Sequence, residues 1–335
     1  MKKKILAAMS GGVDSSAAAI LLQEQGYEVV GATVKMFGNK DVGIKEPDAP
    51  KQDVEDAKAV AEKLGIEHHV LDFSSCFKKC VINHFVNEYK CGRTPNPCVD
   101  CNKHIKFGKM IDIALSNGYD KIATGHYARI QKNKNGRYIL LKAKDESKDQ
   151  SYVLYGLTQY QLSHTLFPLG DYTKAEIRKI AEENCLINAN RPDSQDICFV
   201  PDGNYASFIE KYDSYISKSG DYTDINGNVL GKHKGIINYT IGQRKGLGIA
   251  LGKPQFVISK NAEDNTVVLG DEEHLFKKEV IVNDVNFIPF DKLEEPITVE
   301  AKVRYSGKPA EAGSHQQKSQ CMYRVDSGYN WLHSP

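Results

Sequence analysis

The residues best suited to chemistry form the run Ser10-Gly-Gly-Val-Asp-Ser-Ser16, which joins an apolar stretch of strand length to a helical pattern. Its glycines allow backbone N–H groups to converge on an anion at a helix N-terminus. Ser15 and Ser16 can cap that helix and donate to phosphate oxygens, and Asp14 is placed to bind a magnesium ion. The run lacks the Walker pattern and the dinucleotide fingerprint. A tight turn capped by serine would have the same composition, so the spacing leaves both interpretations open.

Two cysteines, Cys98 and Cys101, stand in Cys-x-x-Cys spacing within residues 94–103, a run that two prolines predict to be a rigid loop. That spacing is typical of zinc or redox sites. A structural zinc ion needs four ligands, and the nearby extra candidates are Cys91 and His104, with no second Cys-x-x-Cys in the chain. The sequence therefore favours a reactive thiol and leaves zinc as an alternative.

Basic residues around the pair support the reactive thiol, because neighbouring cations lower the pKa of a thiol. They are Arg93, Lys103, Lys106 and Lys109. A further thiol, Cys198, stands between Ile197 and Phe199. Apolar neighbours are also typical of a buried, inert cysteine, so both roles stay open for Cys198.

The elements that must position these groups alternate along the first half of the chain. Apolar runs of strand length lie at residues 5–9, 28–36, 69–73 and 121–124. Helical patterns lie at residues 15–25, 52–64, 75–89 and 106–117, and Thr173 with Glu176 forms a capping box for a later helix. This alternation predicts an α/β fold with a doubly wound parallel sheet. Residues 127–143 predict a hairpin with an Asn-Gly turn, and the chain after about residue 215 reads as mostly β.

The composition excludes several classes of protein. With 335 residues, the chain has room for about two or three domains. No apolar run reaches the roughly 18 residues of a membrane span, and the apolar stretch after the basic start is too short for a secretory signal. We therefore expect a cytoplasmic protein without a membrane partner, whose eight cysteines are not a disulfide framework.

Residues 10–16 resemble the pyrophosphate loop of the ATP pyrophosphatases, which adenylate a carbonyl oxygen and release pyrophosphate. Further motifs, in the same order, resemble one family within that group, the bacterial tRNA-specific 2-thiouridylases (MnmA). These motifs are Thr94-Pro-Asn-Pro97, Cys101-Asn-Lys103, Ile105-Lys-Phe107, Ala123-Thr-Gly-His-Tyr-Ala-Arg129, Asp193-Ser194, Ile197-Cys-Phe199 and Tyr239-Thr-Ile-Gly-Gln-Arg-Lys-Gly-Leu-Gly248. The likeness extends from residue 4 to about residue 312.

Three domains are implied by the resemblance. Residues 1–203 would be an ATP-binding pyrophosphate-loop catalytic domain of the adenine nucleotide α-hydrolase-like kind. Residues 204–278 would be a small mixed central domain that binds tRNA, and residues 279–335 a C-terminal β-barrel. Because the sequence after about residue 312 departs from the family, we expect that barrel to be incomplete there.

Individual roles are implied as well. Cys101 would be the catalytic nucleophile and Cys198 would carry a persulfide intermediate, whereas some members have Asp at the position of Cys98. The residues implied to bind ATP are Met9, Ser10, Gly11, Gly12, Val13, Asp14, Ser15, Ser16, Met36 and Gly125, with Asp14 also the candidate ligand of Mg²⁺. The residues implied to contact tRNA are Asn96, Pro97, Cys98, Lys148, Asp149, Gln150, Arg304 and Tyr305.

The implied reaction is ATP-dependent 2-thiolation of the wobble uridine of tRNA, with ATP and Mg²⁺ as cofactors. The implied partners are tRNA and a cysteine desulfurase or sulfur-relay protein that donates sulfur. The net charge of +1 gives no sign of RNA binding, but the charged residues from Lys232 to Gly248 are all basic. Lys302, Arg304 and Lys308 form a shorter basic set beside Tyr305. Each of the two runs is also typical of a solvated face. Two alternatives stay open, namely another adenylating pyrophosphate-loop ligase and a zinc-stabilised RNA-binding module without catalysis.

Overall fold

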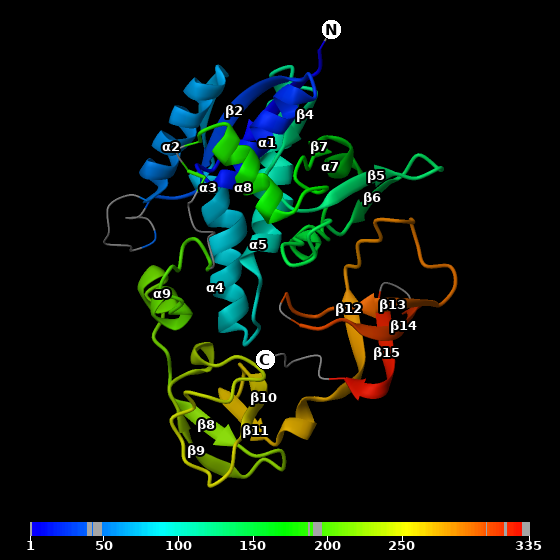
Figure 1. Cartoon of the computed structure of the whole chain (residues 1–335). Coiled ribbons are helices and arrows are strands. Elements are labelled where there is room, and N and C mark those ends of the chain that lie inside the picture. Colours follow the sequence, from blue (N-terminus) through cyan, green and yellow to red (C-terminus); the bar gives the residue numbers. More distant parts are fainter. Residues whose placement is uncertain are drawn as a thin grey trace. The chain divides into compact units, whose positions relative to one another are not determined.

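The computed structural model describes residues 2–38, 42, 49–186, 188–189, 196–305, 307–317 and 320–329 (Figure 1). The motif residues Asp193 and Ser194 lie outside them. Two compact units result, each described here by itself. Unit 1 comprises Met1–His84 and Asn96–Gly203, and unit 2 comprises Phe85–Pro95 and Asn204–Pro335. Across the described ranges, we find no helix with the length and apolar character that a membrane crossing requires.

Unit 1 is built on a parallel sheet with the strand order β3-β2-β1-β4-β7. The strands are β1 Lys4–Ala8, β2 Glu28–Lys35, β3 His68–Asp72, β4 Lys121–Ala123 and β7 Thr165–Leu166. The first four confirm the strands predicted from apolar runs. The chain moves outward from β1 to β3 and then returns to β4 on the other side of β1, which is the doubly wound arrangement that the sequence predicted. Such a reversal leaves a crevice at the carboxyl ends of β1 and β4, where α/β proteins bind ligands.

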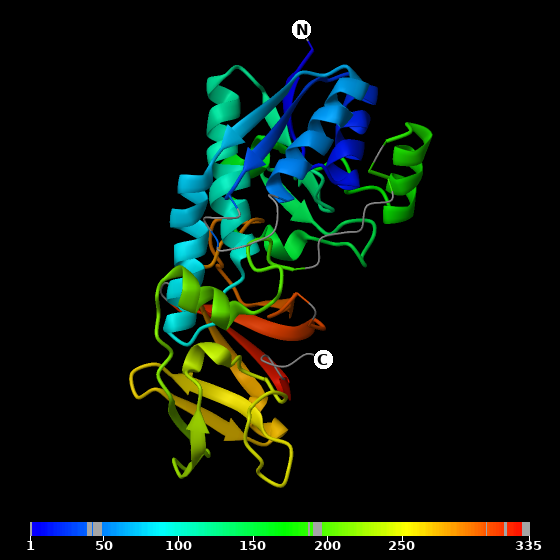
Figure 2. The ribbon, with the colours of Figure 1, turned by 90° about the vertical axis from the view of Figure 1, so that its left-hand side faces the viewer.

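Right-handed crossovers decide which helices cover which face of this sheet. The connections β1–β2 and β2–β3 contain α1 (Val13–Glu24) and α2 (Ala49–Leu64), which lie together on one face (Figure 2). The return from β3 to β4 runs in the opposite direction, so its last helix, α6 (Met110–Ser116), packs on β4 from the other face. Small buried residues of α1, such as Ala17 and Ala18, allow it to approach its neighbours closely.

The β3–β4 connection is almost wholly helical. Its elements are α3 Ser74–Phe77, η2 Lys78–Ile82, α4 Asn83–Lys90, α5 Pro97–Asp100, η3 Cys101–Lys109 and α6. The predicted hairpin is confirmed as β5 Arg129–Lys132 and β6 Tyr138–Leu141. The short elements η4 (Ser151–Val153) and α7 (Gln159–Ser163) follow it. The predicted capping box is also confirmed, because Thr173 and Glu176 cap α8 (Lys174–Glu183), and α8 packs on α1.

Unit 2 is mostly β, as predicted, after the helix α9 (Tyr205–Tyr212). One sheet has the order β10-β11-β8-β9, with β8 Gly220–Thr223, β9 Val229–His233, β10 Phe256–Asn261 and β11 Thr266–Gly270. The short helices η5 (Ile236–Asn238) and η6 (Glu272–Leu275) flank β10 and β11 in the sequence. Tyr222 is fully buried at the centre, and its hydroxyl donates to the carbonyl oxygen of Leu247 at 2.6 Å.

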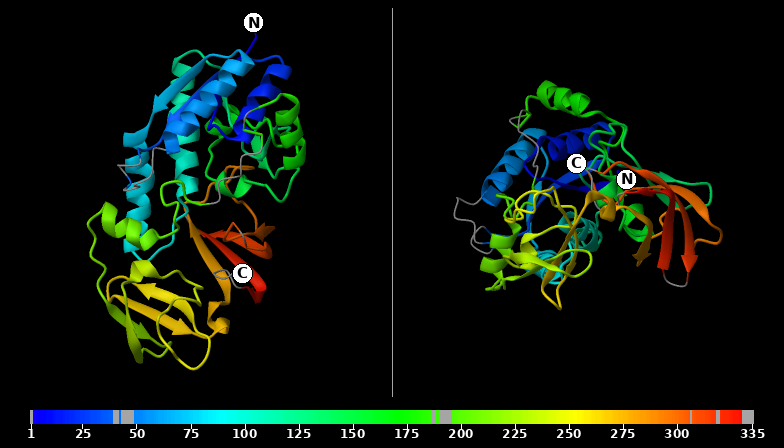
Figure 3. Two further views of the ribbon diagram at one scale, coloured as in Figure 1. Left: turned by 60° about the vertical axis from the view of Figure 1, so that its left-hand side comes forward. Right: turned by 90° about the horizontal axis from the view of Figure 1, so that it is seen from below.

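A second sheet of unit 2 has the order β12-β15-β14-β13 (Figure 3). Its antiparallel strands are β12 Lys277–Asn283, β13 Ile297–Ala301, β14 Ala310–Gln317 and β15 Gln320–Tyr329. Within the described residues the two edge strands, β12 and β13, do not pair with each other. The strands of residues 310–329 therefore extend an open sheet, and the division into a central domain and an incomplete barrel stays a prediction.

Candidate active site

The loop after β1 ends at Gly12, which is the N-cap residue of α1. The sequence predicted that Ser15 or Ser16 caps this helix, and that prediction is wrong. Both serines lie inside the first turn, and their hydroxyls donate back to the carbonyl oxygen of Gly12 at 3.0 and 3.1 Å. The hydroxyl of Ser15 also accepts from the backbone N–H of Ser10 at 3.1 Å. No side chain caps α1, so no capping group competes with an anion for the backbone N–H groups at its N-terminus.

Backbone contacts on two sides fix the position of this loop. A Cβ atom at Gly125, which follows β4, would lie 2.8 Å from the carbonyl carbon of Asp14 and from the backbone nitrogen of Ser15. A Cβ atom at Gly11 would lie 2.7 Å from the carbonyl oxygen of Asp53 in α2, and Gly11 has a φ of +73°. The close contact excludes a side chain at both positions, and at Gly11 the positive φ also favours glycine. Gly125 thus lies against the loop, at the crevice between β1 and β4.

Asp14 is held by residues from two distant segments. The Lys174 Nζ lies 2.8 Å from each carboxylate oxygen of Asp14, and the hydroxyl of Tyr127 donates to Oδ1 at 2.8 Å. Asn188 supports the same loop, since its amide nitrogen donates to the carbonyl oxygen of Gly11 at 2.8 Å. The sequence interpretation missed these three supporting residues. Lys174 carried a signal, as a lysine in the first turn of a helix, where positive charge is unfavourable, and Tyr127 lies in the motif of residues 123–129.

The segment that carries the Cys-x-x-Cys pair is helical, and the prediction of a rigid loop over residues 94–103 is wrong from residue 97 onward. Asn96 is the N-cap of α5, and its side chain accepts from the backbone N–H of Cys98 at 3.1 Å. Pro97 follows as the first helical residue, a position where its missing N–H costs nothing. The prolines thus start a helix that continues through η3 and α6, with Cys98 exposed and Cys101 buried.

Burial, rather than nearby cations, dominates the environment of Cys101. Burial raises the pKa of the Cys101 thiol to about 11, against the opposing effect of Lys106. The expectation of a lowered pKa is therefore wrong for this structure. Two of the other basic residues have partners of their own. Arg93 forms an ion pair with Glu88, and the Lys109 ammonium lies 5.1 Å from the centre of the Phe73 ring. Desolvation of the charged thiolate outweighs one cation.

The thiols of Cys98, Cys101 and Cys198 lie within electrostatic reach of one another. The pKa of Cys198 is raised to about 12, chiefly by desolvation and to a smaller extent by the charges of Cys101 and Cys98. Cys198 is exposed as a residue, whereas its thiol is surrounded by enough protein atoms to be desolvated. The Sγ of Cys101 lies 3.8 Å from the Sδ of Met36, just after β2. The seven cysteines whose side chains the structure describes are free thiols.

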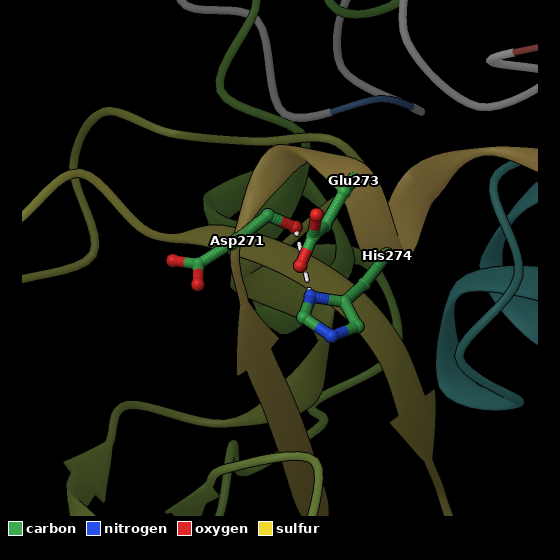
Figure 4. A group of neighbouring side chains, drawn as sticks. All are labelled: Asp271, Glu273 and His274. Carbon is green, nitrogen blue, oxygen red and sulfur yellow. Dashed lines mark hydrogen bonds between the residues drawn. The ribbon is translucent and has the colours of Figure 1, made fainter.

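Among the residues that the structure describes, no group of zinc ligands gathers at the Cys-x-x-Cys pair. Within the described residues, only Asp271, Glu273 and His274 place three or more such ligand atoms within 4.8 Å of one another. Figure 4 shows the Asp271 carboxylate directed away from His274. Lys253 and Gln255 each bind that carboxylate at 2.7 Å, so this group is a surface hydrogen-bond cluster.

Three of the predicted tRNA contacts follow the hairpin in unit 1. Gln150 exchanges hydrogen bonds with Tyr127, because its side chain accepts from the Tyr127 N–H at 2.9 Å and its own N–H donates to the Tyr127 carbonyl at 2.8 Å. Asp149 accepts from the N–H of Ala143 at 2.9 Å, and Lys148 is half-buried. Asp149 and Gln150 thus order the chain around Tyr127, and their contact with tRNA stays a prediction.

Two predicted contacts lie in unit 2. Arg304 donates to the carbonyl oxygen of Ile241 at 2.7 Å, which ties it to the basic run at 232–248. Tyr305 is 49% exposed, and the Lys302 ammonium lies 5.4 Å from its ring centre. An exposed aromatic ring beside cations can stack on a base. At the end of the same run, an open cavity of about 540 Å³ is lined by Arg244, residues 246–251 and residues 253–255.

Comparisons with known proteins give a consistent result. Residues 3–202 match the family described as the tRNA methyl transferase HUP domain. The tRNA-specific 2-thiouridylase MnmA of Clostridioides difficile (strain 630) is 54% identical over 318 residues, which cover 94% of this chain and 88% of that protein. The chain belongs to the MnmA family. The MnmA protein of Acetivibrio thermocellus is 53% identical over 315 residues, 93% of this chain and 88% of its own length.

The match to the MnmA family extends into unit 2. Residues 206–271 match the description of a tRNA methyl transferase PRC-barrel domain. Among solved structures, an NMN synthetase from Francisella tularensis aligns with 65% of this chain and 79% of its own at 13% identity. Its TM-score of 0.36 is too low to support a conclusion about this chain.

Proposed function

We propose that this chain catalyses the ATP-dependent 2-thiolation of the wobble uridine of tRNA. The observation that carries the proposal is 54% identity to a tRNA-specific 2-thiouridylase over 94% of the chain. The loop at the N-terminus of α1 and the contact of Cys101 with Met36 support it, because an uncapped helix N-terminus and a thiol lie at the same end of the sheet of unit 1. As a tRNA-modifying enzyme, it would work in the cytoplasm.

Adenylation is the first step. The C2 oxygen of uracil is a poor leaving group, so it attacks the α-phosphorus of ATP, and pyrophosphate leaves. The uncapped N-terminus of α1, with the loop of residues 10–16, binds the phosphates and stabilises the charge that develops on them. Met36 and Gly125 are the proposed contacts for the rest of the nucleotide. The uridine must leave its base stack for C2 to reach this site.

Sulfur transfer is the second step. The terminal sulfur of a Cys198 persulfide attacks C2, and AMP leaves with the electron pair of the C2–O bond. The Cys101 thiolate then attacks the inner sulfur of Cys198, whose bond to the transferred sulfur breaks and leaves its electron pair on the thiocarbonyl. A Cys101–Cys198 disulfide remains, and a thiol reductant restores both cysteines by supplying two electrons. A cysteine desulfurase or sulfur-relay protein would form the persulfide again.

A magnesium site on Asp14 does not fit the residues around it. Both carboxylate oxygens of Asp14 lie 2.8 Å from the Lys174 ammonium, and no second carboxylate joins it in a described group of metal ligands. A magnesium ion prefers several oxygen ligands in octahedral geometry and avoids an adjacent cation. No step of the proposed reaction therefore uses an ion held by Asp14.

Thiolation of transcribed tRNA in vitro, with ATP, magnesium and a persulfide donor, tests the proposal. We expect 2-thiouridine at the wobble position together with equal amounts of AMP and pyrophosphate. Pyrophosphate release without tRNA, coupled to ligation of a small molecule, would instead favour another adenylating ligase. Stoichiometric zinc in the purified protein, with tRNA binding but no turnover, would favour the RNA-binding module.

A further inference from the structure

Lys174 breaks two ordinary rules of protein structure. It is the first residue of α8, where the positive end of the helix dipole disfavours a cation, and it is only 8% exposed. Residues that violate local preferences in a stable fold are commonly functional. The compensation for both costs lies in Asp14, whose two carboxylate oxygens are each 2.8 Å from the Lys174 ammonium.

Contacts of the Lys174 backbone and of its ammonium group fix the direction of the side chain. Its backbone N–H donates to a carboxylate oxygen of Asp145 at 3.0 Å, and the capping box of Thr173 and Glu176 fixes the first turn of α8. The Tyr127 ring lies 5.9 Å from the ammonium, and the hydroxyl of the same tyrosine donates to Asp14. Two distant segments of unit 1, at Tyr127 and Lys174, thus converge on one carboxylate in the first turn of α1.

Asp14 poses a problem for a phosphate-binding loop. A carboxylate two residues after the N-cap of α1 would repel the phosphates of ATP if its charge were not balanced. A bound magnesium ion is the usual solution, but Lys174 already occupies both oxygens. The backbone of Asp14 also packs against Gly125, so the position of this residue sets the position of the loop.

We propose that Lys174 is a positioning residue of the nucleotide site, which takes the place of a metal ion on Asp14. Its ammonium balances the carboxylate in the absence of metal and anchors the first turn of α1 in the geometry that receives the phosphates. This inference rests on the proposed function only in that the loop binds ATP. It implies that the enzyme uses magnesium solely as the Mg·ATP complex, with no separate ion bound by Asp14.

Equilibrium binding of ATP by the full chain, with and without magnesium, tests this role in a double-mutant cycle. We expect Lys174→Met to weaken ATP binding at least tenfold, because it leaves Asp14 unbalanced. The double variant Asp14→Asn/Lys174→Met should recover most of that loss, because both charges are gone. Lys174→Arg should bind ATP within about threefold of wild type, since a guanidinium also binds a carboxylate through two hydrogen bonds. For Asp14→Asn, the magnesium concentration that gives half-maximal thiolation should not change.

Lys144→Met is the matched control, because it removes an exposed lysine that binds Glu176 at the same end of α8 without touching Asp14. Any of three results would overturn the proposal. These are additive losses of ATP affinity in the double-mutant cycle, ATP binding by Lys174→Met within twofold of wild type, and a tenfold higher magnesium requirement for Asp14→Asn. Should Lys174→Met fail to fold, Lys174→Arg and the double variant decide the question. A wild-type chain that binds no ATP would refute the proposed function, whereas normal ATP binding with an indifferent Lys174 refutes this inference alone.

Discussion

The thiol of Cys101 and the thioether of Met36 lie in contact, with 3.8 Å between their sulfur atoms, although 65 residues separate them in the chain. Met36 follows β2, and Cys101 lies in the helix that starts at Pro97. The family resemblance implies a nucleotide contact for the first and nucleophilic attack for the second. Their contact gives both steps of the proposed reaction a common location in unit 1.

Removal of either thiol proposed for sulfur transfer should abolish thiolation and leave ATP binding intact. We expect Cys101→Ser and Cys198→Ser to lower tRNA thiolation on the order of a thousandfold, because a hydroxyl neither carries a persulfide nor resolves one. Binding of ATP should stay within about threefold of wild type, since the loop of residues 10–16 is intact. Thiolation assays and ATP titrations measure both effects. Cys185→Ser, at an exposed cysteine, is the control, and full thiolation by either test variant would refute the assigned roles.

The reactivity of Cys101 should rise with pH over an unusually long range. Burial raises its pKa to about 11, so the thiolate is the minor form below that pH. The rate of alkylation should therefore increase about tenfold for each pH unit from 7 to 10, because the thiolate is the nucleophile. Mass spectrometry of the Cys101 peptide after timed iodoacetamide treatment gives the rate. A plateau near pH 8.5, as for a free thiol, would contradict the effect of burial.

Gly125→Ala should damage the nucleotide site. Its Cβ atom would lie 2.8 Å from the backbone of Asp14 and Ser15, so the loop must shift. We expect ATP to bind at least tenfold more weakly and the free energy of unfolding to fall by about 1–3 kcal/mol. The matched control is Gly156→Ala, whose Cβ atom would meet only the Lys103 side chain at an ordinary 3.7 Å. Equal ATP affinity in the two variants would show that the loop tolerates the displacement.

The contribution of the Asn96 cap to the stability of helix α5 should also be measurable. Asn96→Ala removes the acceptor for the Cys98 N–H and should destabilise the first turn by about 1 kcal/mol. Hydrogen exchange in the peptide that covers residues 97–103 should then become roughly fivefold faster. Asn96→Asp keeps an acceptor in place and should exchange like wild type. Unchanged exchange in Asn96→Ala would mean that Pro97 alone suffices to start the helix.

Patterns within short segments account for the correct sequence predictions. The four apolar runs became β1 to β4, and the Thr173–Glu176 capping box begins α8, because both signals depend on neighbours in the chain. The loop prediction for residues 94–103 failed for a local reason, since Pro97 is compatible with the first position of a helix as well as with a loop. The serine cap failed because Gly12, one residue before α1, already occupies the N-cap position.

By itself, the sequence determined the order of the first four strands and their helices, the glycine-rich turn of residues 10–16 and the family likeness, since each is carried by residues close together in the chain. Tertiary structure alone decided the environment of the reactive groups. Burial reversed the expected shift in the pKa of Cys101, and the partner of Asp14 proved to be Lys174, 160 residues away. Desolvation and ion pairing depend on atoms that meet only after the sheet and its helices have packed, so no spacing of residues encodes them directly.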